Sequence, residues 1–432
     1  MIRIGYDKYN DDTWEIIQPN GLIGQEEVPE TYRLYLPPWY GEIFQRYKIP
    51  FQIKSSEELI QENNKDKWVY LLEPNGDPRG WFGMFEDENP NPIKSLFAGV
   101  DKKTIQSCRD DKSVICLWQP NEGFPSEWIN INVFEEIYKE LDRFGISPNN
   151  FIYVCGNWKI EIEYKRWKEQ LTEQFKGWED IHLCAFNNER YLDFKTKWGG
   201  QLSKFDSSLK REKLFVCFNR ELRPHRKLFL TMMMEAKLMD VGMISSKKFD
   251  IETFFRVGKE LGISKGISKK LEGYAKKLVE ITPLVVDVDE WDTNHFDTSN
   301  KWVYDSTYFS LITTTWFGED TLFFDEKIWK PMANEHPFLV VGNYKVLEEL
   351  RRQNFKTFHP HIDESYDLEP HPYKRMKLII KEIQRLSKFS LHEMNQWYKK
   401  LQPILEHNNK QLYSLDSLNE LTDKFNDITK GK

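Results

Sequence analysis

The sequence has no long apolar run, no cysteine framework and no signal-like beginning. No apolar stretch in its 432 residues approaches the roughly 18 residues that cross a bilayer, and the opening MIRIGYDKYNDD lacks the apolar core of a signal peptide. Its five cysteines form no CxxC pair and no metal-ligand spacing, and most of them lie in apolar, strand-like segments. An odd cysteine count without a framework is typical of a reducing compartment. We therefore expect a cytoplasmic protein that makes no membrane contact.

Charge of one sign does not dominate either. There are 61 Lys and Arg residues against 68 Asp and Glu residues, a net charge of -7, and the two signs are interspersed. This balance argues against a broad nucleic-acid surface, although it leaves room for a local basic cleft. Aromatic residues make up 15% of the chain and charged residues 30%, which excludes a disordered class. The length suits about two to three domains.

The first 195 residues alternate between strand-like and helix-like segments. Five apolar runs predict strands: RIGYD, KWVYLLEPN, SVICLWQPN, NFIYVCGN and DIHLCAFN. Amphipathic helices are clearest at NVFEEIYKELDRFGI and EIEYKRWKEQLTEQFKGW. Strands alternating with helices predict a parallel sheet with crossover helices. Ligands of such sheets bind beyond the carboxyl ends of the strands, so we expect the polar loops after these strands to meet a ligand.

A second α/β unit begins after an aperiodic segment rich in Gly, Ser and Lys. The run KLFVCFN predicts a strand buried on both faces, and Pro224 suits the first position of the helix that follows. Four basic residues crowd the turn and the helix start: Arg220, Arg223, His225 and Arg226. Cations at a helix N-terminus typically cost a few tenths to about 1 kcal/mol each, and a bound phosphate would remove that cost. The alternative is that they point into water or pair with acids such as Glu221.

Two later patterns have simple surface explanations. The segment TPLVVDVDEWDTN predicts a short strand followed by Asp287 and Asp289, whose oxygens could hold a divalent metal on a diphosphate. In a chain with 68 acidic residues, an acidic surface loop is the favoured interpretation, and we do not expect a metal. The Lys-rich segment 249–280 predicts a helix with a solvated face, the alternative being a surface that tracks phosphates.

The stretch after the predicted strand YFSLITTTWF carries a second candidate anion site. The helix EKIWKPMA begins there, with Asp325 as its expected N-cap, and the strand HPFLVVGN and the helix VLEELRRQNF follow. Glu326 could accept hydrogen bonds from ribose hydroxyls, while Lys327 and the helix amides could meet phosphate. The alternative is a surface pair of Glu326 with Lys330, worth about 0.2–0.5 kcal/mol. From Tyr373 the chain is predicted to be helical to near its end, with the closing residues NDITKGK frayed.

The segment DEKIWKPMANEHPFLVVGN resembles the donor-binding half of glycosyltransferases of the GT-B architecture. It is most similar to the fucosyltransferase-type pattern, in which a Thr-Glu-Lys helix start precedes a strand of the form Pro-φ-φ-φ-Gly; Asp325 stands here in place of the Thr. The upstream FVCFNRELRPHR is similar to a turn in phage-encoded glycosyltransferases. The likeness covers about residues 213–367 and ends at FKTFHPHIDESYD.

The resemblance implies an α/β fold with two Rossmann-like domains facing across a cleft, followed by C-terminal helices. The acceptor domain would be 1–195, the linker 196–212, the nucleotide-sugar donor domain 213–372 and the C-terminal helices 373–432. Donor contacts would come from Asn219, Arg220, Arg223, His225, Arg226, Glu326 and Lys327.

The resemblance further implies transfer of a hexosyl or pentosyl group from a nucleotide sugar to an acceptor hydroxyl, without a metal cofactor. Fixed cations would stabilise the departing diphosphate, and a base from the N-terminal domain would activate the acceptor. The acids at strand ends are the candidates for the base: Glu122, which we prefer, Glu73 and Asp7. The acceptor could be a glycan or a hydroxylated base in phage DNA. The alternatives are a non-catalytic nucleotide-binding or assembly module and metal-dependent nucleotide chemistry at Asp287 and Asp289.

Overall fold

The structure is a computed structural model of the whole chain. It describes residues 1–6, 50–62, 64–72, 77–82, 95–97, 100–120, 122–171, 175–187, 202–252, 254, 256, 261, 263–286, 300–317, 320–414 and 416–431. The contacts divide the chain into two compact units. The first unit comprises residues 1–190 and 415–432, and the second comprises residues 191–414.

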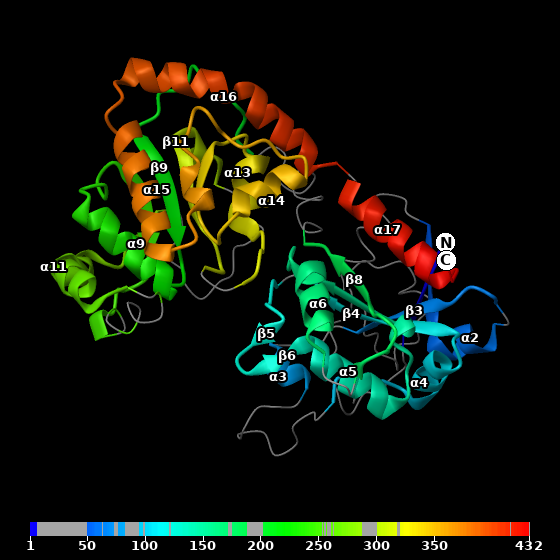
Figure 1. Cartoon of the computed structure of the whole chain (residues 1–432). Coiled ribbons are helices and arrows are strands. Elements are labelled where there is room, and N and C mark those ends of the chain that lie inside the picture. Colours follow the sequence, from blue (N-terminus) through cyan, green and yellow to red (C-terminus); the bar gives the residue numbers. More distant parts are fainter. Residues whose placement is uncertain are drawn as a thin grey trace. The chain divides into compact units, whose positions relative to one another are not determined.

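The first unit is built on a six-stranded parallel sheet of order β2-β1-β3-β4-β7-β8 (Figure 1). Its strands are β1 (Ile2–Tyr6), β2 (Phe51–Ser55), β3 (Trp68–Leu72), β4 (Ser113–Gln119), β7 (Phe151–Cys155) and β8 (His182–Ala185). β3, β4 and β7 are buried at every position, as expected of central parallel strands covered on both faces. The five strands predicted in this region are confirmed, and β2 was missed.

Helices and one small hairpin complete the first unit. They are α2 (Ser56–Gln61), α3 (Pro78–Trp81), α4 (Lys102–Arg109), β5 (Glu127–Trp128), β6 (Ile131–Asn132), α5 (Val133–Phe144), the 3-10 turn η2 (Pro148–Asn150), α6 (Ile160–Glu169) and α17 (Asp416–Thr429). Gly145 ends α5 in the left-handed region, with φ 64°. α6 ends well before the predicted amphipathic segment does.

The last helix belongs to the first unit. The prediction from the sequence had placed it with the other C-terminal helices, in residues 373–432. The amide of Lys67 donates a 2.8 Å hydrogen bond to the carbonyl oxygen of Thr429. The Lys424 ammonium lies 3.0 Å from a carboxylate oxygen of Glu161 on α6 and also donates to the carbonyl oxygen of Leu183 on β8. Main-chain and side-chain contacts therefore both fix α17 in this unit.

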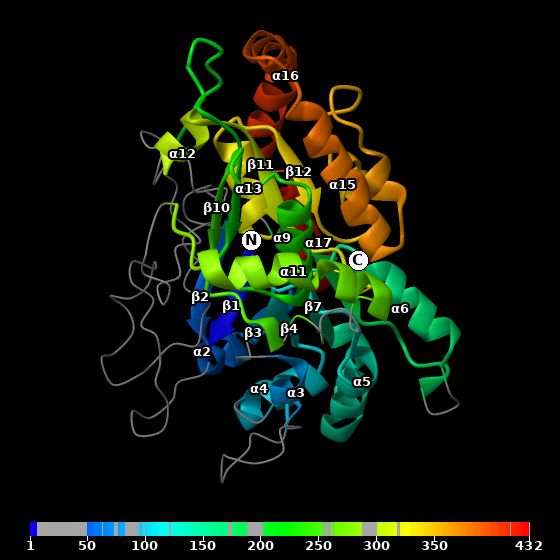
Figure 2. The same cartoon turned by 90° about the vertical axis from the view of Figure 1, so that its left-hand side faces the viewer.

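The second unit has a four-stranded parallel sheet of order β10-β9-β11-β12. Its strands are β9 (Lys213–Asn219), β10 (Gly242–Ser246), β11 (Thr307–Thr313) and β12 (Phe338–Val341). Its helices and turns are α9 (Pro224–Glu235), α11 (Lys265–Ile281), α12 (Lys301–Asp305), α13 (Glu326–Ala333), α14 (Val346–Arg352), η5 (Ser365–Leu368), α15 (Pro372–Leu386) and α16 (Leu391–Leu412). α11 lies beside α9 in both views (Figures 1 and 2).

Several details of this unit differ from expectation. Gly242 begins β10 and does not end α9, which stops at Glu235. The predicted strand after Thr282 is reduced to one bridge between Ser246 and Leu284. In the Lys-rich segment, α11 begins at Lys265, and Ile251 and Glu252 near the start of the segment are also helical.

The acids of the FKTFHPHIDESYD segment support the main chain. The Asp367 carboxylate accepts hydrogen bonds from the amides of Leu347 and Glu348 at the start of α14, at 2.9 and 3.0 Å. The Glu364 carboxylate accepts from the amide of Phe358 at 2.5 Å. This part of the sequence pattern therefore has a structural explanation.

The α/β class with two Rossmann-like parallel sheets and C-terminal helices is confirmed. The facing of the two domains across a cleft stays a prediction. Within the described residues, no helix is long and apolar enough to span a bilayer.

Candidate functional site

The candidate site lies at the carboxyl edge of the second sheet. β9 ends at Asn219 and β11 ends at Thr313, and because these strands are parallel neighbours their ends meet at one edge. Asn219 is fully buried, and its side-chain oxygen accepts a 2.8 Å hydrogen bond from the Thr313 hydroxyl. The main-chain amide of Asn219 donates to the Ser245 hydroxyl at 3.2 Å. Asn219 thus joins the ends of three strands.

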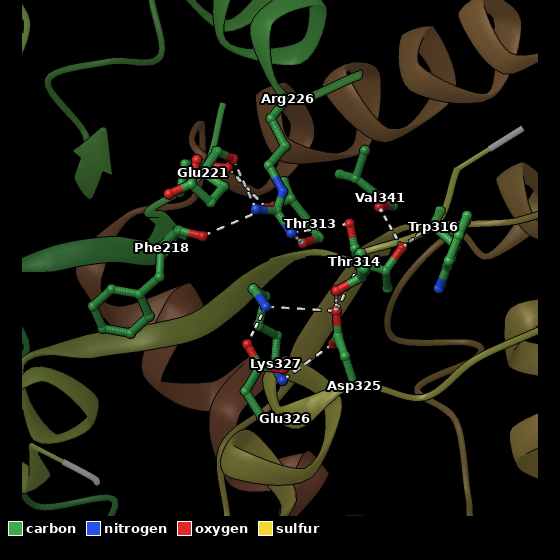
Figure 3. Close-up of polar contacts among 12 residues, drawn as sticks. Phe218, Glu221, Arg226, Thr313, Thr314, Trp316, Asp325, Glu326, Lys327 and Val341 are labelled. Atoms are coloured by element: carbon green, nitrogen blue, oxygen red, sulfur yellow. Dashed lines mark hydrogen bonds and ion pairs between the residues drawn. The ribbon is translucent and has the colours of Figure 1, made fainter. Parts of the chain in front are cut away.

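Arg226 ties the start of α9 to the end of β11. Its guanidinium donates to the carbonyl oxygens of Thr313 and Thr314 at 2.9 and 3.1 Å, and to that of Glu221 at 2.8 Å (Figure 3). The residue is only 3% exposed. Burial lowers the pKa of Arg226, and the charge of the nearby Asp325 opposes that shift. Because both terminal nitrogens serve the main chain, Arg226 acts first as a structural tie.

His225 holds the segment that follows β11. Its Nε2 lies 2.9 Å from the carbonyl oxygen of Thr314, and its ring stacks on Phe317 with centroids 5.0 Å apart. The guanidinium of Arg375, from α15, lies 4.8 Å from the Phe317 ring centroid. Burial, and next the charge of Arg226, lower the pKa of His225 well below its usual value. The imidazole is therefore neutral, and Nε2–H donates to the carbonyl.

Two further arginines stand at this edge. Arg223 is the N-cap residue of α9 and its side chain is exposed, while Arg220 is half-buried in the turn before it. Glu221, the acid considered as an alternative partner, pairs with Lys247 at 2.6 Å. The hydrogen bond from Lys247 is the main cause that lowers the pKa of Glu221. Arg223 is thus the cation at the start of α9 that is most open to solvent.

Asp325, Glu326 and Lys327 form a charged cluster at the start of α13. Asp325 is the predicted N-cap: its carboxylate accepts from the amide of Lys327 at 3.2 Å and from that of Thr315 at 2.6 Å. The Lys327 ammonium contacts the Glu326 carboxylate and lies 3.6 Å from Asp325 Oδ2 (Figure 3). The ammonium therefore lies between two carboxylates and only 19% of its side chain is exposed.

The two acids of this cluster have opposite pKa shifts. Burial raises the pKa of Asp325, whose side chain is 1% exposed, and outweighs the attraction of Lys327. Burial also acts on Glu326, but the charge and hydrogen bond of Lys327 outweigh it and lower the pKa of Glu326. Glu326 therefore stays ionised at neutral pH. The ends of β9 and β11 and the starts of α9 and α13 carry the cations Arg220, Arg223, Arg226 and Lys327 together with the acids Glu221, Asp325 and Glu326.

The first unit contributes one described candidate base. Glu122 is half-buried in the loop after β4, and its carbonyl oxygen accepts a 3.1 Å hydrogen bond from the amide of Gly156 after β7. It therefore lies at the carboxyl edge of the first sheet. Asp7, Glu73, Asp287 and Asp289 lie outside the described residues. Within residues that the structure does describe, no group of three or more His, Cys, Asp or Glu side chains could hold a metal.

Sequence reasoning did not single out the partners that organise this edge. The carbonyl oxygens of Thr313 and Thr314 receive Arg226 and His225, and the run of three threonines at the strand end was the available signal. Arg375 and Phe317 gave no local signal, because their contact joins segments far apart in the sequence.

Comparisons with known proteins give weak similarity only. No protein-family model and no curated protein matches the sequence. A solved trehalose-6-phosphate synthase from Burkholderia multivorans is 10% identical with a TM-score of 0.38, over 90% of this chain and 75% of that chain. A glycosylation-associated protein complex from Streptococcus agalactiae is 12% identical with a TM-score of 0.31, over 96% of this chain and 60% of that chain. At these scores the similarity carries no functional argument, and the fold class rests on the two parallel sheets themselves.

Proposed function

We propose that the chain is a glycosyltransferase that moves a sugar from a nucleotide-sugar donor to an acceptor hydroxyl. The observation that supports this most is the excess of cations at the carboxyl edge of the second sheet, where α9 and α13 also begin. Helix N-termini and fixed cations together suit a diphosphate. We infer that the second unit is the donor domain and the first the acceptor domain.

The proposed donor contacts divide by how each side chain is already used. Arg223 is exposed at the N-terminus of α9 and would meet the diphosphate directly. Lys327 would exchange the Glu326 carboxylate for a phosphate oxygen, which would free ionised Glu326 to accept from the ribose hydroxyls. Arg226 and His225 would support the site indirectly, by holding the start of α9 against the end of β11. Asn219 would support it by joining the strand ends.

The chemical step follows from this charge distribution. As the bond from the anomeric carbon to the diphosphate oxygen breaks, negative charge builds on the leaving group, and fixed cations lower the barrier without a metal. The acceptor oxygen bonds to the anomeric carbon and loses its proton to a base. We propose Glu122 for that base, with Glu73 and Asp7 as the other candidates.

The finer assignment extends the resemblance seen in the sequence. The transferred group would be a hexose or pentose, and the acceptor a glycan or a hydroxylated base in phage DNA. The net charge of -7 favours the glycan, because a DNA acceptor requires a phosphate-binding surface. The site would act in the cytoplasm.

A second candidate function is a non-catalytic nucleotide-binding or assembly module. It is favoured by the finding that Arg226 and His225 serve the protein's own carbonyl groups, since such contacts can persist without turnover. This alternative predicts nucleotide binding and a function that does not change when Glu122 is replaced.

Incubation with UDP-, GDP-, ADP- and dTDP-sugars, each with glycan or hydroxymethylated duplex as acceptor, tests the proposal. We expect transfer with one donor, and a loss of at least about 100-fold in kcat for Glu122→Gln at unchanged nucleotide affinity. Nucleotide binding without transfer by the wild type would favour the assembly module. The absence of both binding and turnover with every donor would contradict the proposal.

A further inference from the structure

The small hairpin after β4 carries an anomalous turn. β5 and β6 pair Glu127 with Asn132 and Trp128 with Ile131, so the loop between them is Ile129-Asn130. Both loop residues have positive φ, 44° and 67°. Two-residue turns of this kind favour Asn-Gly, Asp-Gly or Gly-Gly, because a β-branched side chain fits the left-handed region poorly. Among the positive-φ residues in the described part of the chain, Ile129 is the only β-branched one.

The side chain of Ile129 is also 50% exposed. An exposed isoleucine gains little from burial, so the unfavourable backbone conformation is not offset by packing. Ile162 on α6 offers a contrast, since it is 61% exposed but sits in an ordinary helical conformation. Strain of this kind, kept at an exposed apolar residue, points to a functional role.

Three hydrogen bonds hold the base of the hairpin. The amide of Ser126 donates a 2.7 Å hydrogen bond to the buried carboxylate of Glu163. The amide of Val133 donates to the carbonyl oxygen of Ser126 at 2.8 Å. At the other end, the Asn132 side chain caps α5 by accepting from the Glu135 amide at 2.9 Å. Both ends of the hairpin are thus hydrogen-bonded to neighbouring residues of the first unit.

An aromatic cluster lies directly behind the tip. The ring of Trp128 packs on Phe124 with centroids 5.5 Å apart, and Phe124 meets Trp81 of α3 edge-on at 5.7 Å. Figure 1 accordingly places the labels of β5 and β6 beside α3. Trp128 is half-buried, and the exposed Ile129 follows it directly in the chain.

A polar pair stands next to the indole. Arg79 and Asp77 pair at 2.7 Å, and their side chains are 34% and 20% exposed. Burial raises the pKa of Asp77, but the hydrogen bonds of Arg79 and a contribution from Trp128 outweigh it and lower that pKa. The ionised carboxylate therefore lies near both the guanidinium and the indole.

We infer that the Trp128-Ile129 tip and the Asp77-Arg79 pair form a saccharide-binding site on the first unit. The chemistry suits a sugar ring: its C–H face would lie on the indole and the isoleucine, and its hydroxyls would bond to the carboxylate and the guanidinium. That this saccharide is the transfer acceptor rests on the proposed function. The site takes a glycan and not a DNA base.

The test applies the labelled full-length chain to an array of defined oligosaccharides. We expect the wild type to bind a subset of them, and Ile129→Asn to lose at least about tenfold of that signal while its Tm stays the same or rises, because Asn suits the left-handed region. Arg79→Met should lose the signal as well. The matched control Ile162→Asn should bind as the wild type does.

The inference is overturned if the wild type binds no oligosaccharide, or if Ile129→Asn binds as the wild type does. Retention of a hydroxymethylcytosine duplex in place of oligosaccharides also overturns it. A parallel thermal-shift measurement with nucleoside diphosphates separates the two proposals. Stabilisation by a nucleotide, with no binding to any oligosaccharide on the array, contradicts the saccharide site but not the proposed function. Array binding without nucleotide stabilisation contradicts the proposed function and supports the saccharide site.

Discussion

The guanidinium of Arg226 donates a 2.9 Å hydrogen bond to the carbonyl oxygen of Thr313. This contact joins the start of a helix to the end of a neighbouring strand at the edge where a ligand of a parallel sheet is expected. It also separates the basic residues of the turn into two groups. Arg226 supports the edge, while Arg223 is exposed on it.

Replacement of Arg226 should therefore lower the stability, whereas replacement of Arg223 should weaken nucleotide binding. We expect Arg226→Lys to lower the free energy of unfolding by about 2–4 kcal/mol, because a single ammonium nitrogen does not span the carbonyl oxygens that two guanidinium nitrogens reach. Arg223→Ala should change it by less than about 0.5 kcal/mol, since the side chain is exposed, and should weaken nucleotide binding. Urea titrations of both variants measure this. Equal stability of Arg226→Lys and the wild type would show that these hydrogen bonds do not contribute to the free energy of unfolding.

Lys327 should be the cation whose loss weakens nucleotide binding most, at some cost in stability because Asp325 and Glu326 lose their partner. Its ammonium contacts Glu326 and lies 3.6 Å from Asp325, so it can move to a phosphate without leaving the cluster. We expect Lys327→Met to weaken nucleoside diphosphate binding at least about tenfold, which corresponds to about 1.4 kcal/mol. Lys345→Met, which removes an exposed lysine paired with Glu348, is the matched control. Similar affinities for the two variants would speak against the assignment.

Acid should destabilise the second unit through its buried histidines. His336 is 1% exposed, its Nε2 lies 2.9 Å from the Thr307 carbonyl oxygen, and burial lowers the pKa of His336 from about 6.5 to about 3. Between about pH 3 and pH 6.5, the pKa values of His336 in the folded and the unfolded chain, only the unfolded chain takes up the proton. The contribution of His336 is therefore complete above about pH 6.5 and falls as the pH drops. Buried His225 acts in the same direction.

We expect His336 alone to account for about 2 kcal/mol of lost stability between pH 8 and pH 5. Urea titrations across this range measure the slope. His336→Gln, which can still donate to Thr307, should flatten it, and replacement of the exposed His371 by Gln should not. A stability that does not change with pH over this range would refute the argument.

Chelation should leave transfer unchanged, because the proposed donor contacts supply the positive charge that the departing diphosphate needs. The measurement compares initial rates with and without EDTA at a fixed donor concentration. A rate restored by Mg²⁺ or Mn²⁺ after EDTA treatment would instead favour metal chemistry at Asp287 and Asp289.

Much of the fold could be predicted because it depends on local patterns. Apolar runs of strand length gave β9, β11 and β12, and the side chain expected to cap α13 does so. The elements that could not be predicted have physical explanations too. β2 has a half-buried pattern with no buried run, and the periodicity of α17 shows which face is apolar but not which sheet that face covers.

The site was harder to predict than the fold. Clustered cations mark an edge, but a sequence does not show whether a guanidinium faces a ligand or the protein's own carbonyl groups. For Arg226 that depends on the end of β11, about 90 residues further along the chain. The chain around Glu221 shows the same limit, since its partner Lys247 comes from the far side of α9 and β10.

Calorimetric titration with UDP, GDP, ADP and dTDP tests the central claim most directly. The wild type should bind one of these nucleotides with a micromolar Kd, and the double variant Arg223→Ala with Lys327→Met should bind it at least about 100-fold more weakly while it stays folded in the absence of urea. Failure of every nucleotide to bind the wild type, or equal affinity in the double variant, would contradict the claim that this charged edge is a diphosphate site.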